Sequence, residues 1–199
     1  MNLPLARPTI ILASRSPRRL ELLLAAGYTV EVVYPNQTAE DGALPGETTS
    51  QLVARLAYQK AADVAARVQQ GLILGCDTVA ECNGQILGKP DDEHHARQIL
   101  RKLRGQRHRV LSGLCLWKKP DRDPLIRVDE TQLEMDNLSD QQIEDYIASG
   151  QWVGKAGAFG YQDQLGWVRV LEGSESNVVG LPMELLETMI LEIQGASAT

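Results

Sequence analysis

The sequence predicts an α/β protein built on a mixed sheet. Short apolar runs alternate with stretches of helical periodicity along most of the chain, which is typical of strands connected by helices. The Asn83-Gly84 pair between two extended runs adds an antiparallel hairpin. No repeat, low-complexity segment or linker interrupts the 199 residues, so we expect a single domain over residues 1–199.

The composition excludes several classes of function. A net charge of −6 argues against general nucleic-acid binding, which needs a basic face. The three cysteines lack metal-site spacing and indicate free thiols in a reducing compartment. The N-terminus has no signal-peptide core, and no apolar run reaches membrane-spanning length. We therefore expect a cytoplasmic protein that has neither nucleic acid nor a membrane as its partner.

The first element is an apolar strand at residues 9–13, followed by a helix that Gly27 ends. Ser14 and Ser16 precede the helix, and Ser16-Pro17 fits the N-cap and the first helical position. The positive charges of Arg18 and Arg19 lie at the positive end of the helix dipole, which is unfavourable. An anion such as a polyphosphate between them would remove this conflict. The alternative is two solvated arginines on a surface helix.

A second strand is expected at residues 28–34, then a polar loop at 35–46 and a helix from Thr48 or Thr49 to about residue 70. Glu40 lies in the loop, which either connects elements or helps to hold a metal. Lys60 lies at the edge of the apolar stripe, where periodicity alone favours a side chain that reaches solvent.

Polar residues follow the next two extended runs. Residues 72–76 predict a buried strand that ends at Asp77-Thr78, and the second hairpin arm ends before Lys89. Pro90 keeps the backbone of Lys89 extended. An acid and a lysine at neighbouring strand ends suit ligand chemistry, and a structural ion pair between them fits equally well.

The rest of the chain continues the alternation of helices and strands. Capping residues mark two of the helices, and a glycine-rich stretch allows backbone to approach a ligand. The predicted elements are a helix at 94–104, strands at 107–118 and 125–135, a helix at 140–148, the glycine-rich stretch at 151–164, a strand at 165–171 and a helix at 183–193.

Five separated motifs occur in an order that resembles the Maf family of nucleoside triphosphate pyrophosphatases. They are LASRSPRR at 12–19, GCDTV at 75–79, LGKP at 87–90, KAGAFG at 155–160 and VGLP at 179–182. The resemblance covers nearly the whole chain. It implies a Maf/ITPase-like fold, in which a mixed, bent sheet with flanking helices forms two lobes around a deep cleft.

The resemblance also implies the reaction and the roles of residues. The reaction is hydrolysis of a nucleoside triphosphate to the monophosphate and pyrophosphate, assisted by Mg²⁺ or Mn²⁺. Asp77 matches the proton acceptor and, with Glu40, a metal ligand. Lys60 and Lys89 match catalytic cations. Four residues match the substrate-binding set around the triphosphate: Ser14, Ser16, Arg18 and Arg19. A homodimer is implied as well.

Three positions resemble the branch of the family that acts on dTTP and UTP: Arg18, Thr78 and Gln162. Phe159 replaces the usual tyrosine of that branch, Asp163 stands where it usually has glycine, and residues 174–177 also differ from its commonest form. Two alternatives therefore stay open. One is the same reaction on a modified purine triphosphate such as 7-methyl-GTP. The other is a nucleotide-binding regulator of septum formation.

Overall fold

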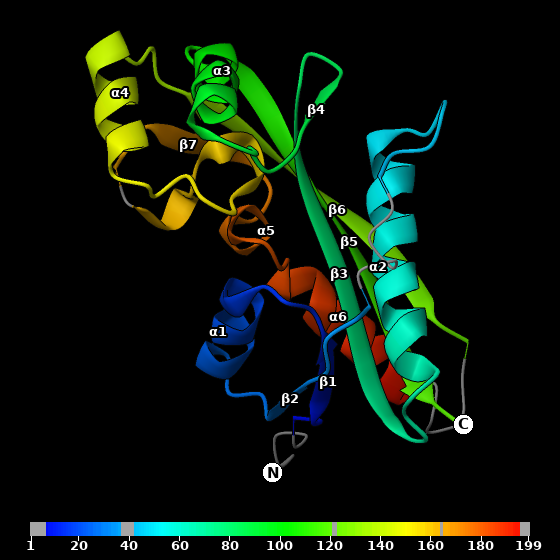
Figure 1. The fold of residues 1–199 in the computed structure, drawn as a ribbon. Helices are drawn as coiled ribbons and strands as arrows, with labels where there is room; N and C mark the ends of the chain where they lie inside the picture. Colours follow the sequence, from blue (N-terminus) through cyan, green and yellow to red (C-terminus); the bar gives the residue numbers. More distant parts are fainter. Residues whose placement is uncertain (1–6, 37–41, 121–122, 164, 196–199) are drawn as a thin grey trace.

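The computed structural model describes residues 7–36, 42–120, 123–163 and 165–195. For Gln162 it describes the backbone alone. Seven strands form one sheet (Figure 1). The strands are β1 (Ile10–Ala13), β2 (Val30–Val32), β3 (Gly71–Cys82), β4 (Gln85–Leu87), β5 (Arg107–Lys119), β6 (Leu125–Met135) and β7 (Val168–Glu172). The sheet is mixed, as predicted, because β1 pairs in parallel with β2 and β3 while the other pairs are antiparallel.

Helices flank this sheet in the order in which the sequence predicts them. They are α1 (Pro17–Ala25), α2 (Thr49–Ala65), α3 (Glu93–Leu103), α4 (Asp140–Ala148), α5 (Glu175–Val179) and α6 (Met183–Gly195), with the short turns η2 (Ala156–Ala158) and η3 (Tyr161–Asp163). The structure places Thr48 at the N-cap of α2 and Ser139 at the N-cap of α4, and each forms a capping box with the glutamine three residues later. The five-residue α5 is an addition that periodicity did not predict.

The expectation of two lobes is confirmed. The long strands β3 and β5 run through both lobes (Figure 1). One apolar core lies among α1, β1 and α6 and includes Leu12, Leu74 and Leu186. A separate core lies among α3, α4, η2 and β7 and includes Leu100 and Ile143. Each lobe thus buries its own apolar surface, and the shared strands hold the two lobes together.

Two glycines allow α2 to lie directly on the sheet. A Cβ at Gly75 in β3 would come within 2.2 Å of the Ala57 carbonyl oxygen, and one at Gly113 in β5 within 2.1 Å of the Val53 carbonyl oxygen. No other residue type fits at that distance. This close packing buries the inner side of α2, including Lys60 one turn after Ala57.

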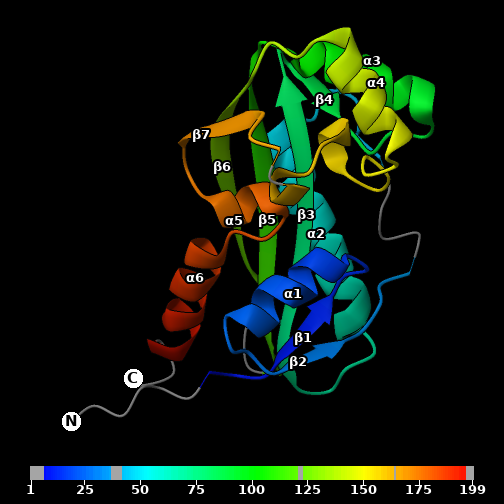
Figure 2. The same cartoon turned by 90° about the vertical axis from the view of Figure 1, so that its left-hand side faces the viewer.

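The edge of β3 is interrupted halfway along. β1 ends where Ala13 pairs with Gly75, and β4 pairs with β3 only from Ala80 onward. Residues 76–79 therefore have no strand partner on this edge among the described strands. Figure 2 shows β1 beside the lower half of β3 and β4 beside its upper half. Ser14 leaves β1, and Lys89 follows β4, so both approach the interruption.

Several boundaries differ from the sequence-based expectation: β2 covers only Val30–Val32 of the expected 28–34, and β7 begins at Val168 instead of residue 165. β3 does not end at Asp77 but continues to Cys82, because β5 pairs with it from Gly71 to Glu81. Helix α2 ends at Ala65, earlier than the expected residue 70. The hairpin turn is as predicted, with positive φ at Asn83 (51°) and Gly84 (75°). No helix in the described ranges has the length and apolar character that a membrane crossing requires.

Candidate active site

A cavity of about 340 Å³ lies between the two lobes, at the interrupted edge of β3. Its walls come from the β1–α1 turn, α2, β3, the segment after β4, the glycine-rich stretch and the end of α5. Eight residues that the sequence analysis selected line it: Ser14, Ser16, Arg18, Arg19, Lys60, Asp77, Thr78 and Lys89. Glu40 lies outside the described residues, and Gln162 is placed in η3 by its backbone alone.

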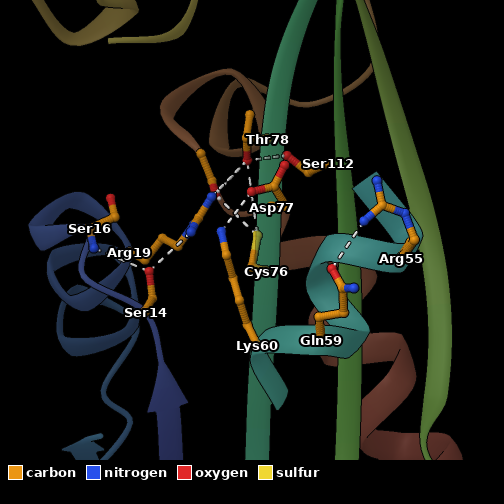
Figure 3. A network of polar contacts seen from close by, with 11 residues as sticks. Ser14, Ser16, Arg19, Arg55, Gln59, Lys60, Cys76, Asp77, Thr78 and Ser112 are labelled. Atoms are coloured by element: carbon orange, nitrogen blue, oxygen red, sulfur yellow. Dashed lines mark hydrogen bonds and ion pairs between the residues drawn. The ribbon is translucent and has the colours of Figure 1, made fainter. Parts of the chain in front are cut away.

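Lys60 and Asp77 form an ion pair at the floor of this cavity. The Lys60 Nζ donates to Asp77 Oδ1 at 2.6 Å, and the lysine is only 5% exposed (Figure 3). The prediction of a solvent-reaching Lys60 from periodicity is wrong, because the two glycines draw α2 onto the sheet and turn this position inward. Within the described residues, Asp77 Oδ2 accepts no hydrogen bond from the protein.

Arg19 is a buried connector between three segments. Its Nε donates to the Gly180 carbonyl oxygen at 2.9 Å, Nη1 to Ser14 Oγ at 3.0 Å and Nη2 to Thr78 Oγ1 at 3.1 Å (Figure 3). The fork geometry of a guanidinium allows these three bonds at once. The described residues therefore accept from three of the five N–H groups, which leaves two of the donors for an anion in the cavity.

Arg18 reaches across the cavity to the other lobe. Its Nη2 lies 3.4 Å from the Gly154 carbonyl oxygen. Burial lowers the pKa of Arg18, and the neighbouring charge of Arg19 lowers it further, while Asp163 opposes both. An arginine in this setting still carries its charge at neutral pH. Arg18 and Arg19 are thus not the solvated surface pair of the alternative interpretation.

The β1–α1 turn presents hydroxyls and backbone donors to the cavity. The Ser16 N–H donates to Ser14 Oγ at 3.1 Å. Ser16 occupies the N-cap and Pro17 the first turn, as predicted, but the Ser16 side chain makes no capping hydrogen bond. The N-cap side chain therefore leaves the N–H groups of the first turn of α1 uncapped, which suits an anionic ligand.

Lys89 is exposed and lines the opposite wall. The backbone before it is held in place, because the Gly157 N–H donates to the Gly88 carbonyl oxygen at 3.1 Å. The hairpin and the glycine-rich stretch thereby bring Lys89 to the cavity from the second lobe. Sequence reasoning placed it at the end of a strand, which is correct.

Sequence reasoning missed the support around Thr78. Its Oγ1 donates to the Gly180 carbonyl oxygen at 3.2 Å and shares a hydrogen bond of 2.7 Å with Ser112 Oγ (Figure 3). Ser112 is fully buried and pairs with Thr78 in the β3–β5 register. A lone serine within an apolar strand was the only sequence signal that could have suggested it.

The acidic side chain of the cavity fits a metal ion that binds together with a triphosphate. Asp77 is the only acidic side chain among the described residues that line the cavity. The described ranges contain no group of three His, Cys, Asp or Glu side chains that could hold a metal ion. Mg²⁺ typically binds one or two carboxylates together with substrate phosphates and water, and a single carboxylate beside phosphate-binding groups matches that pattern.

This arrangement of a cationic cavity between two lobes of a mixed sheet defines a class of phosphate-binding α/β protein. The sequence of the chain specifies the class further. Residues 9–193 match the family described as Maf-like protein, and the chain belongs to that family.

Curated relatives share most of the chain. It is 51% identical over 183 residues to a dTTP/UTP pyrophosphatase of Rhodopirellula baltica, covering 92% of this chain and 81% of the relative. It is 40% identical over 182 residues to a dTTP/UTP pyrophosphatase of Dictyoglomus thermophilum, covering 91% and 94%. A HAM1 protein from Coxiella burnetii aligns over 93% of this chain and 99% of its own, with a TM-score of 0.49 and 15% identity.

Proposed function

We propose that this chain is a nucleoside triphosphate pyrophosphatase that hydrolyses dTTP and UTP to the monophosphate and pyrophosphate. The observation that carries the proposal is the cavity in which the Lys60–Asp77 pair faces the hydroxyls and cations of the β1–α1 turn and Lys89. Several relatives that match about nine-tenths of the chain bear the name dTTP/UTP pyrophosphatase, which supports this choice of substrate.

In the proposed reaction, Asp77 acts as the general base. Water attacks the α-phosphorus, the bond between that phosphorus and the bridging oxygen breaks, and pyrophosphate leaves. Asp77 accepts the proton of the attacking water, for which its Oδ2 is available while Oδ1 accepts from Lys60. Lys60 is thereby a positioning group for the carboxylate as well as a cation beside the triphosphate.

The cations around the cavity stabilise the leaving group. Cleavage of the α–β anhydride places negative charge on the departing pyrophosphate, and fixed positive groups lower the energy of that charge. Arg18 and the remaining N–H groups of Arg19 come from one lobe, and Lys89 comes from the other. A triphosphate that binds between them therefore draws the two lobes together.

We infer that a divalent cation, Mg²⁺ or Mn²⁺, assists the reaction. Asp77 would hold it together with phosphate oxygens and water, and the cation would supply charge neutralisation at the triphosphate. Glu40 stays a prediction as the second carboxylate ligand, since it lies outside the described residues.

The rest of the cavity suits a nucleoside. The apolar side chains of Phe159 and Val178 are among those that line it, and Thr78 follows Asp77 directly on β3. Gln162 remains the predicted reader of the pyrimidine edge, because an amide supplies both a donor and an acceptor. Gln162→Ala is expected to reduce the preference for dTTP and UTP. An unchanged preference would contradict this role.

The experiment that tests the proposal is a panel of canonical and modified nucleotides with Mg²⁺ or Mn²⁺, in which monophosphate and pyrophosphate are measured separately. We expect dTTP and UTP to be hydrolysed fastest, with pyrophosphate as the product, and Asp77→Asn to lose about 10³-fold in kcat. Faster hydrolysis of 7-methyl-GTP would support the alternative substrate. Tight nucleotide binding without hydrolysis would favour a regulatory role. Sedimentation of the same sample tests the implied homodimer.

A further inference from the structure

A buried ion pair in the cavity wall takes no part in the chemistry described so far. Lys155 lines the cavity, and its Nζ donates to Asp163 Oδ1 at 2.5 Å and to Oδ2 at 2.6 Å. The two side chains are only 11% and 9% exposed. They lie eight residues apart, so the ion pair joins the two ends of the segment 155–163 within the glycine-rich stretch. A charge pair removed from water to this extent is costly unless its geometry is good, so its position in the cavity wall calls for an explanation.

Asp163 holds a second group with the same carboxylate. The Tyr146 hydroxyl donates to Oδ2 at 2.7 Å. The Tyr146 ring packs against Phe159 and Trp167, each with its centroid 5.6 Å away. Phe159 in turn lines the cavity. One carboxylate thus anchors two parts of the wall, the ammonium of Lys155 directly and the ring of Phe159 through Tyr146.

The backbone of the stretch is fitted to this arrangement. A Cβ at Gly160 would lie 2.6 Å from the Lys155 Nζ, so a side chain at this position would displace the lysine from its path. Gly157 and Ala158 have positive φ of 70° and 56°, which folds the chain back between the two charged residues. Left-handed alanine is strained and persists only where surrounding contacts hold it.

We propose that Asp163 is a positioning residue for the nucleoside end of the cavity, where it fixes Lys155 and, through Tyr146, Phe159 as the wall against which base and sugar are placed. The proposal rests on the proposed function for the identity of the ligand. Pairing with Asp163 also neutralises Lys155, so that this lysine does not compete with Arg18 and Lys89 for the triphosphate.

The test compares two probes that occupy different parts of the cavity. An α,β-methylene analogue of dTTP fills both the phosphate and the nucleoside ends, whereas inorganic tripolyphosphate fills the phosphate end alone. Calorimetry measures the affinity of each for the full-length wild type, Asp163→Asn and the double variant with Lys155→Met and Asp163→Asn. Glu144→Gln is the matched control, because Glu144 pairs with Arg97 between α3 and α4 of the same lobe, and neither residue lines the cavity.

For Asp163→Asn we expect the analogue to bind about tenfold more weakly, because small displacements of positioning groups carry large penalties. Tripolyphosphate should bind as tightly as to the wild type, or more tightly. Asp163→Asn leaves a buried ammonium without its counter-ion and is expected to lower Tm. The double variant removes both charges and should recover Tm while its affinity for the analogue stays weak, which separates positioning from folding. Glu144→Gln should leave both affinities unchanged.

Two results would overturn the proposal. One is an affinity for the analogue within twofold of the wild type in both variants. The other is a parallel loss of affinity for tripolyphosphate, which would place the effect at the phosphate end. These readouts do not depend on turnover. A wild type that binds the analogue but hydrolyses no nucleotide would refute the proposed function alone, and one that binds no nucleotide analogue would refute both.

Discussion

The Lys60 Nζ and the Asp77 Oδ1 lie 2.6 Å apart, although α2 and β3 contribute them from positions 17 residues apart in the chain. The pair forms because α2 packs directly on two glycines of the sheet. It lies in the part of β3 between the end of its pairing with β1 and the start of its pairing with β4. A carboxylate at an unpaired strand edge can face a ligand while its strand remains rigid. The first prediction concerns this pair.

Lys60→Met should disable catalysis without unfolding the protein. The methionine fills the same apolar space beside α2, but Asp77 loses the donor that orients it. We expect kcat for dTTP to fall about 100-fold or more, within the range found for misplaced general bases. Steady-state kinetics and a thermal melt measure the two effects. Lys102→Met on the exposed side of α3 is the control, and wild-type kcat in Lys60→Met would show that Asp77 does not need its partner.

Gly75→Ala should push α2 off the sheet. The added methyl would come within 2.2 Å of the Ala57 carbonyl oxygen and 2.9 Å of the Ala61 amide nitrogen, and backbone atoms cannot yield as a flexible side chain can. We expect a loss of about 3 kcal/mol in the free energy of unfolding, from urea denaturation. Activity should fall as well, since Lys60 lies between the two displaced contacts. Gly195→Ala is the control, because a Cβ there meets no atom of the described residues within 4 Å, and it should change neither property.

Arg19→Lys should weaken the junction between the lobes. An ammonium cannot reach Ser14, Thr78 and Gly180 together, so polar groups around it lose a buried partner. We expect a loss of about 1–3 kcal/mol in the free energy of unfolding and a lower kcat/KM for dTTP. Arg15→Lys is the control for stability, because Arg15 is exposed and its partners among the described residues are the Pro35 carbonyl and the Tyr34 ring, although Arg15 also lines the cavity. Equal stability of the two variants would contradict the connector role.

The three thiols should be unreactive in the folded protein. Cys76, Cys82 and Cys115 are free and buried. Burial raises the pKa of each thiol, that of Cys115 to about 12, so the reactive thiolate is scarce at pH 8. With Ellman's reagent at pH 8 we expect almost no reaction before urea is added and three thiols afterwards. Rapid reaction of any thiol in the native protein would show that the described packing opens readily.

Most elements of the fold could be read from local patterns. Alternation, capping residues and the Asn83-Gly84 turn depend on neighbours within a few residues, and these elements are present in the predicted order, although β2 and β7 are shorter and α2 ends earlier than predicted. The end of β3 could not be read in this way. Whether a strand continues through Asp77 depends on its pairing with β5, which lies more than 30 residues further along the chain.

The same division holds for the site. Motifs selected Ser14, Arg18, Asp77 and Lys89 because their chemistry is visible in the residue types. Periodicity misjudged Lys60, since the burial of a residue at the edge of an apolar stripe depends on how closely the helix approaches its sheet. Ser112 was not selected, and Lys155 and Asp163 were named as motif positions but not as a pair, because their partners are defined by strand register and by the folding back of a loop.

The sequence by itself determined the α/β class, the family and the chemical groups available to a triphosphate, because these follow from residue types and short spacings. Only the tertiary structure decided that Arg19 is largely a connector, that Lys60 is buried against Asp77 and that one carboxylate anchors the wall near Phe159. The physical reason is that burial and hydrogen bonding depend on contacts between distant segments, and such contacts exist only after the two lobes have packed against the shared strands.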